Sequence, residues 1–246
     1  MATASTLEPP ARLNALQRLM GVFFQPKATF ADIAARPDWI LPTVLLCIAS
    51  FAVIFTFTQR VGWHGYMEKQ FAKSSRAQQM SAEDREKAID AQARVAPYFG
   101  YVFGTLGVAL SIVVLAAVGL GVFNLTAGAQ LKFKTCMAIV AYAWMPFLLA
   151  YILAIVVILL KPPDMVDLDN LLASNPGALL ASDAPKWMLV LLGSLDIFVI
   201  WTLLLQAVGY STANPRKVSF GRALASLIVV WIIYIAAKVG WAAAFA

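Results

Sequence analysis

Two charged side chains and one amide lie within long apolar stretches of this sequence. Asp196 and Gln206 fall in the run 187–208, and Lys238 falls in the run 223–246. A charge at the centre of a bilayer costs roughly 2.5–3.5 kcal/mol on insertion scales, so such residues face a bundle interior, find a partner or line water. The sequence leaves three interpretations open: a structural pair of Asp196 with Lys238, a lysine that extends to the membrane interface, and a polar path for transport that includes Gln206.

A second pattern concerns helix packing and helix shape. Gly100, Gly104, Gly107 and Ser111 follow the spacing i, i+4, i+7, i+11, which puts all four on one face of a helix. Small residues let helix backbones approach closely in lipid, so this stripe predicts packing within the chain or between chains. Pro146 removes a backbone hydrogen bond from another apolar run and predicts a helix kink there.

Several kinds of chemistry are not expected. His64 is the only histidine and has no cysteine near it in the sequence, so we expect no metal site. The sequence shows no nucleophile elbow, nucleotide-binding fingerprint or paired catalytic carboxylates. Basic and aromatic residues are not interleaved as in a nucleic-acid platform, although the formal net charge is +6. We therefore expect no catalytic residues, no cofactor and no nucleic-acid partner.

The elements that carry these residues are predicted to be membrane-spanning helices. The chain is 61% hydrophobic and only 13% charged, far from the balance of a soluble domain. About 20 helical residues cross a hydrocarbon core of about 30 Å, and the runs are continuously apolar rather than alternating. The predicted fold is an all-α polytopic membrane bundle, a five-helix transmembrane domain over residues 39–246 with spans at 39–58, 98–123, 136–160, 187–208 and 223–246.

Residues 1–38 are predicted to form a separate N-terminal segment at the membrane interface. Its apolar residues recur at helical spacing before Pro26, and a second short helix is expected to open with a capping box from Thr29 to Asp32. The first helix either lies in the membrane interface or packs against the spanning bundle. Its apolar face is formed by Leu13, Leu16, Met20, Phe23 and Phe24.

The charges of the connecting segments favour a cytoplasmic N-terminus. Each side of the membrane receives nine Lys and Arg residues, so the basic count alone does not decide the orientation. The segments on the N-terminal side sum to formal charges of +1, +2 and +3, and those on the opposite side to +2 and −2. Cytoplasmic segments of membrane proteins are enriched in Lys and Arg. With five spans, the C-terminus is then outside.

Three stretches resemble one family of membrane proteins. They are Arg18 to Phe30, followed by Ile33-Ala34 and Pro37-Asp38-Trp39; Phe133 to Leu148, with Ala141-Tyr142 and Pro146; and Leu195 to Phe198, with Trp201 and an end at Gly209. Together they resemble the Yip family, the Ypt/Rab-interacting membrane proteins, in its bacterial branch.

The resemblance implies five spans, a cytoplasmic N-terminus and an outward C-terminus, here in the bacterial inner membrane. It also implies an architectural or binding role for Asp196 and Trp201. Eukaryotic members bind small GTPases through a long cytoplasmic N-terminal region. Only 38 residues precede the first predicted span here, so small-GTPase binding is not expected.

Two functions are consistent with these features. The first is a membrane scaffold or interaction protein without catalysis, whose partners are membrane lipids and either further copies of the chain or other membrane proteins. The alternative is a small transporter or channel that uses Asp196 and Lys238.

Overall fold

Regular structure is helical throughout the described part of the computed structural model. The structure describes residues 12–72, 74, 77, 79–181 and 184–244. Within these ranges every regular element is an α-helix or a short 3-10 turn. The all-α fold class predicted from the sequence is therefore confirmed.

Four helical segments of the described chain are long and apolar enough to cross a bilayer. They are α3 (Ile40–Arg60), α6 (Ala82–Ala127), α7 with α8 (Phe133–Ala143 and Met145–Leu160) and α11 (Phe220–Ala244). A fifth span results when α9 (Lys186–Gly193) and α10 (Ile197–Ala213), which are bent by 44° at a short break, are counted as one. The polytopic membrane bundle is confirmed, with four spans or, counting the bent pair, the predicted five.

Helix α6 is much longer than the predicted span at 98–123. It contains 46 residues and continues through Pro97, so it is about 70 Å long, roughly twice the thickness of a hydrocarbon core. Ser81 caps its start, because the Ser81 hydroxyl oxygen accepts a hydrogen bond from the Asp84 backbone N–H at 3.1 Å. The N-terminal part of α6 therefore extends beyond the bilayer and packs against α4 (Trp63–Ala72).

Helix α7 lies at the centre of the bundle. Every residue from Thr135 to Ala143 is buried, and α7 contacts α6, α10, α2 and α3. The third span is interrupted at Trp144, and Pro146 stands buried at the second position of α8. Helix α3 packs against both α6 and α8, and α10 packs against α11.

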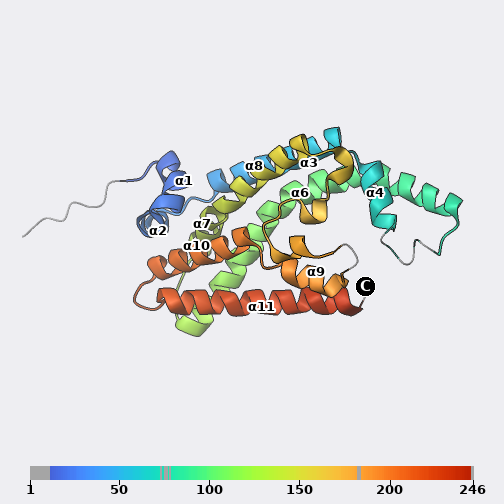
Figure 1. The fold of residues 1–246 in the computed structure, drawn as a ribbon. Helices are drawn as coiled ribbons and strands as arrows, with labels where there is room; N and C mark the ends of the chain where they lie inside the picture. Colours follow the sequence, from blue (N-terminus) through green and yellow to red (C-terminus); the bar gives the residue numbers. More distant parts are fainter. Residues whose placement is uncertain (1–11, 73, 75–76, 78, 182–183, 245–246) are drawn as a thin grey trace, which may run out of the picture.

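The two ends of the bundle carry different elements (Figure 1). Helices α1 (Ala15–Phe24) and α2 (Pro26–Ala35) lie at one end, together with the turn between α10 and α11. Helix α4 and the C-terminal end of α11 lie at the other end. A connection with three 3-10 turns, η1 (Pro163–Met165), η2 (Leu168–Asn170) and η3 (Pro176–Leu179), joins α8 to α9.

The N-terminal segment forms two helices, with one difference from the predicted boundaries. Helix α2 begins at Pro26, so Thr29 lies inside it and donates its hydroxyl hydrogen bond to the Gln25 carbonyl oxygen at 2.9 Å. No capping box forms at Thr29. Proline fits the first turn of a helix, so α2 starts three residues earlier than predicted. The capping box of this segment is made by Asn14 and Gln17 at the start of α1.

Helix α1 combines the two arrangements that the sequence left open. Val22 is fully buried against the bundle, and Phe23 makes an edge-on ring contact with Trp201 of α10. On the outer side, Leu16 is 68% exposed and Phe24 is 75% exposed, with Met20 between them at 51%. The helix therefore packs on the bundle with one face and presents an apolar stripe, Leu16, Met20 and Phe24, on another.

The packing of α6 on α10 depends on a missing side chain. A Cβ atom at Gly119 would lie 1.9 Å from the hydroxyl oxygen of Tyr210 and 2.5 Å from its ring. Tyr210 is fully buried and also packs against Phe123 in a tilted ring contact, with a ring-centroid distance of 4.3 Å. The ring therefore has no room to move away from a larger residue.

We expect Gly119→Ala to destabilise the bundle by about 1–3 kcal/mol, because the added methyl group overpacks the site of Tyr210. Gly121→Ala is the matched control on the same helix, since nothing lies within 4 Å of a Cβ there. Unfolding of both variants in detergent measures the difference. Equal stability of the two variants would show that α6 and α10 separate easily at this point.

Candidate functional site

Asp196 lies at the break between α9 and α10, whereas the sequence predicts it inside one continuous helix. Its Oδ1 accepts hydrogen bonds from the backbone N–H groups of Phe198 at 2.8 Å and Val199 at 3.3 Å. Its other carboxylate oxygen accepts a hydrogen bond from the hydroxyl of Ser174. Asp196 is thus the N-cap of α10, and it satisfies backbone donors that lipid cannot.

The connection between α8 and α9 folds back onto this break. The backbone N–H of Ile197 donates a 3.0 Å hydrogen bond to the carbonyl oxygen of Ser174. A Cβ at Gly177 would come within 3.0 Å of the backbone nitrogen of Gly193, so these two segments of the chain are in contact through their backbones. The break is therefore held by a loop that precedes it by about twenty residues in the sequence.

The structure does not join the three polar residues predicted for a transport path. Lys238 is exposed on α11, and its ammonium nitrogen lies 5.6 Å from the ring centroid of Tyr234. Asp196 and Lys238, both described, form no ion pair. Gln206 is buried, 5% exposed, about 15 Å farther along α10 than Asp196.

The first two residues of the small-residue stripe, Gly100 and Gly104, pack against other helices of the same chain. A Cβ at Gly104 would lie 3.2 Å from Ile54 of α3, and one at Gly100 would lie 2.9 Å from Trp63. Ser50 of α3 donates a 2.8 Å hydrogen bond to the carbonyl oxygen of Gly104. The close approach of α3 and α6 therefore uses Gly100 and Gly104.

The other half of the stripe faces a groove. No atom lies within 4 Å of a Cβ built on Gly107, and Ser111 is half-buried. The groove has a volume of about 330 Å³ and is lined by Phe103, Gly104, Gly107, Val108, Ser111, Trp144, Phe147 and Tyr151. One of its walls, Phe103, is 66% exposed, so the groove opens outward from the bundle.

A buried ion pair holds α1 against α2, and it is not among the contacts predicted above from the sequence. The Nε and one terminal nitrogen of Arg18 both lie 2.7 Å from Oδ2 of Asp32. The remaining terminal nitrogen of Arg18 donates to the carbonyl oxygen of Arg36 at 3.1 Å. Arg36 in turn forms an ion pair with the second carboxylate oxygen of Asp32. The side chains of Arg18 and Asp32 are 8% and 10% exposed.

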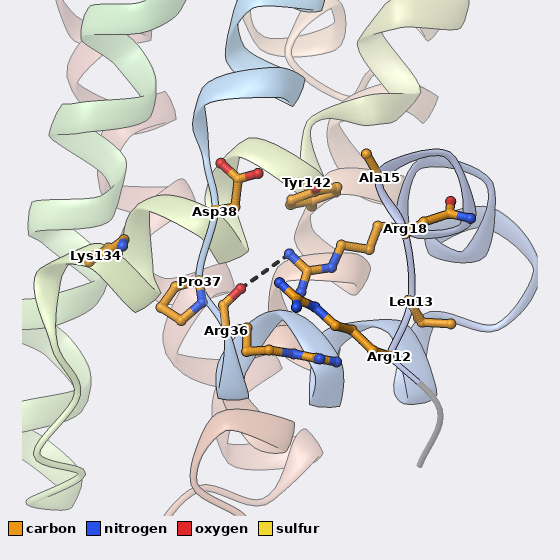
Figure 2. Close-up of a pocket in the computed structure, with 10 residues that line it drawn as sticks. Arg12, Leu13, Ala15, Arg18, Arg36, Pro37, Asp38, Lys134 and Tyr142 are labelled. Atoms are coloured by element: carbon orange, nitrogen blue, oxygen red, sulfur yellow. Dashed lines mark hydrogen bonds between the residues drawn. The ribbon is translucent and has the colours of Figure 1, made fainter.

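A cationic pocket lies beside this ion pair (Figure 2). It has a volume of about 610 Å³. Four of its lining side chains are basic, and only one lining side chain is a carboxylate. Partial burial, followed by the positive charges of Arg12 and Arg18, lowers the pKa of the Arg36 guanidinium. The pocket is lined by Arg12, Leu13, Asn14, Ala15, Arg18, Arg36, Pro37, Asp38, Lys134 and Tyr142.

His64 finds acidic neighbours that lie on α6. Its Nε2 is 3.1 Å from Oδ1 of Asp90 and 3.7 Å from Oε1 of Glu86. The three side chains are about half exposed or more. Their arrangement links α4 to the extended part of α6 at the surface, where such contacts contribute little to stability.

One sequence signal pointed to the missed ion pair. Arg18 and Val22 are four residues apart, so they share a face of α1, and Val22 is apolar. An arginine on the face that enters the protein interior requires a buried anion. Which carboxylate serves is not a local property, because Asp32 is fourteen residues away on another helix.

We expect Asp32→Asn to lower the free energy of unfolding by about 3–5 kcal/mol, because Arg18 is then left as a buried cation without a counter-charge. Glu83→Gln is the control: it breaks the exposed Glu83–Lys87 pair, which is worth about 0–1 kcal/mol. Thermal unfolding in detergent measures both variants. Losses of equal size would mean that the Arg18–Asp32 pair is no more important than a surface contact.

The comparisons with known proteins agree with this architecture. A family model described as the Yip1 domain matches residues 20–241, from within α1 almost to the end of α11. No curated protein and no solved structure matches the chain. The family match covers nearly the whole membrane bundle, and the chain therefore belongs to the Yip family of integral membrane proteins.

Proposed function

We propose that this protein is a non-catalytic scaffold of the bacterial inner membrane that assembles with a second copy of itself through the groove on α6. The observation that carries the proposal is the groove at Gly107 and Ser111, which the chain leaves unfilled. Other membrane proteins that present a matching helix are the second class of partner. Membrane lipids surround the assembly, and neither nucleic acid nor a small GTPase is among the proposed partners.

The composition of the groove suits a transmembrane helix. In lipid, helices associate through close van der Waals packing, and small residues allow their backbones to approach. Gly107 provides such a point of approach, while Trp144 and Phe147, in an edge-on ring contact, provide an apolar wall. Leu106 and Leu110, each 64% exposed, give α6 further apolar surface in the same stretch of the helix.

The proposed absence of catalysis is supported by the use that the fold makes of its charged groups. The Asp196 carboxylate accepts three hydrogen bonds as a helix cap. The Asp32 carboxylate is paired with Arg18 and Arg36. Both groups are engaged in holding helices, which is a structural task.

The proposed orientation has the N-terminus in the cytoplasm and the C-terminus outside. Helices α1 and α2 and the turn between α10 and α11 share one end of the bundle, and Asn214 donates a hydrogen bond to the carbonyl oxygen of Ala129 there at 2.8 Å. The sequence segments that meet at this end carry the net positive charges +1, +2 and +3. This excess of basic residues supports a cytoplasmic location.

Filling the groove should prevent assembly without unfolding the protein. We expect Gly107→Leu to weaken self-association by about tenfold or more, because the new side chain occupies the space of the incoming helix. Energy transfer between donor- and acceptor-labelled copies in proteoliposomes measures association.

Gly121→Leu is the control, since Gly121 is equally open but is not among the residues that line the groove. Unchanged energy transfer in Gly107→Leu, or a wild-type protein that is strictly monomeric at all protein-to-lipid ratios, would contradict the proposed assembly.

The alternative is a small transporter or channel, and the bent pair of α9 and α10 is the observation that favours it. Transporters place ion and substrate sites at such broken helices. Here the carboxylate of Asp196 lies at the break, with Ser174 beside it.

A substitution at Asp196 separates the two functions. As a helix cap, Asp196→Asn should change stability by less than about 0.5 kcal/mol, whereas Asp196→Ala should cost about 1 kcal/mol, because asparagine caps helices almost as well as aspartate. As a transport site, Asp196→Asn should abolish ion flux. Flux into proteoliposomes that depends on the protein and is lost in Asp196→Asn would favour the transporter over the scaffold.

A further inference from the structure

The pocket beside α1 contains positive charge that the chain does not neutralise. Arg18 and Arg36 share the Asp32 carboxylate. Among the residues that the structure describes, Arg12 and Lys134 have no ion-pair partner. Asp38 also lines the pocket, but its Oδ1 accepts the backbone N–H of Ile40 at 3.2 Å. The pocket therefore has an excess of cations, with Arg12 and Arg18 near Tyr142 and with Lys134 at the opposite rim, beyond Pro37 and Asp38 in this view (Figure 2).

A hydrogen-bond donor in the wall of this pocket also lacks a partner. Tyr142 is fully buried, and its hydroxyl oxygen makes no hydrogen bond. Buried hydroxyl groups in folded proteins are nearly always hydrogen-bonded, so the Tyr142 hydroxyl is available to a ligand that enters the pocket. Arg18 has two further N–H groups for a ligand, because three of the five N–H groups of its guanidinium bind Asp32 and Arg36.

The position of the pocket indicates the source of the anion. Asp38 and Arg36 immediately precede α3, so the pocket lies where the first span leaves the bilayer. Helix α1, which supplies Arg18, exposes the apolar stripe Leu16, Met20 and Phe24. An anion that brings its own apolar chains would place them in the bilayer beside this end of the bundle.

We propose that Arg12, Arg18, Lys134 and Tyr142 form a binding site for the phosphate of an anionic phospholipid. Guanidinium groups and an ammonium group recognise phosphate oxygens through charge-assisted hydrogen bonds. Basic pockets between membrane helices bind anionic lipid head groups. A volume of about 610 Å³ lies within the usual range of ligand sites and accommodates a phosphate with a glycerol substituent.

The role of the lipid follows from the elements that meet at the site. Arg12 and Arg18 belong to the N-terminal segment, and Lys134 and Tyr142 belong to α7 at the centre of the bundle. A phosphate held by both would fasten α1 to the bundle. The N-terminal segment would then be positioned by lipid composition as well as by the Arg18–Asp32 pair.

The test uses the purified full-length protein in detergent micelles, with phosphatidylglycerol as the probe and phosphatidylcholine as the neutral lipid. Native mass spectrometry counts retained lipids, and titration gives the affinity. We expect one phosphatidylglycerol per chain to bind more tightly than phosphatidylcholine. The double variant Arg12→Gln/Lys134→Gln should weaken this binding about 25-fold, since each basic residue contributes roughly a factor of five.

Two further variants separate a specific site from general attraction. Arg216→Gln/Lys217→Gln removes the same charge from exposed positions at the same end of the bundle. At an ionic strength of about 150 mM it should change the lipid affinity less than threefold, because exposed charges are screened by salt. Tyr142→Phe removes only the hydroxyl and should weaken binding several-fold while leaving the fold intact.

Three results would overturn the proposal. Equal losses in the two double variants would show general electrostatic attraction without a site. Equal binding of phosphatidylcholine would show that the anionic charge is not recognised. Displacement of the lipid by inorganic phosphate at equal concentration would show that the site takes a free phosphate rather than a lipid. Should Arg12→Gln/Lys134→Gln fail to fold, unchanged affinity in Tyr142→Phe overturns the proposal by itself.

Discussion

The hydrocarbon of a bilayer offers no hydrogen-bond partners, and this constraint governs the structure of the whole bundle. Each polar group inside it must be satisfied by another part of the chain. At the break between α9 and α10, Asp196 and Ser174 satisfy the backbone groups that the break exposes. Between α3 and α6, the hydroxyl of Ser50 bonds to the Gly104 carbonyl oxygen. The break between α9 and α10 therefore occurs where the chain has such partners available.

The same constraint explains the buried ion pair at the N-terminal end. Arg18 lies on the face of α1 that meets the bundle, and its charge is tolerable there only with Asp32 at 2.7 Å. The pair fixes the angle between α1 and α2, which pack on α7 and α10. One face of α1 is thereby held against the protein, and its apolar stripe is left exposed. The described part of the N-terminal segment, helices α1 and α2, therefore packs against the bundle.

Two hollows in the surface of the described chain carry the proposals made above. At Gly107 the apolar surface is hollow, which suits another helix. Near Tyr142 a pocket is lined by four basic side chains and one carboxylate, and the Tyr142 hydroxyl makes no hydrogen bond. The proposed scaffold role and the proposed lipid site rest on these two places. The two sites lie on different elements, so binding at one does not require the other.

The sequence by itself determined the membrane bundle, because a run of about twenty apolar residues is a local property that only a spanning helix explains. It also placed the small residues of α6 on one face, since helical spacing is fixed by 3.6 residues per turn. Tertiary structure alone decided that Gly100 and Gly104 pack against α3 whereas Gly107 lines a groove. The positions of the neighbouring helices determine this difference. Tertiary structure likewise decided that Asp196 caps a broken helix, that Lys238 stays apart from it, and that Asp32 neutralises Arg18. These contacts depend on residues that are distant in the sequence. The spacing of apolar residues does not predict which polar groups meet across a bundle.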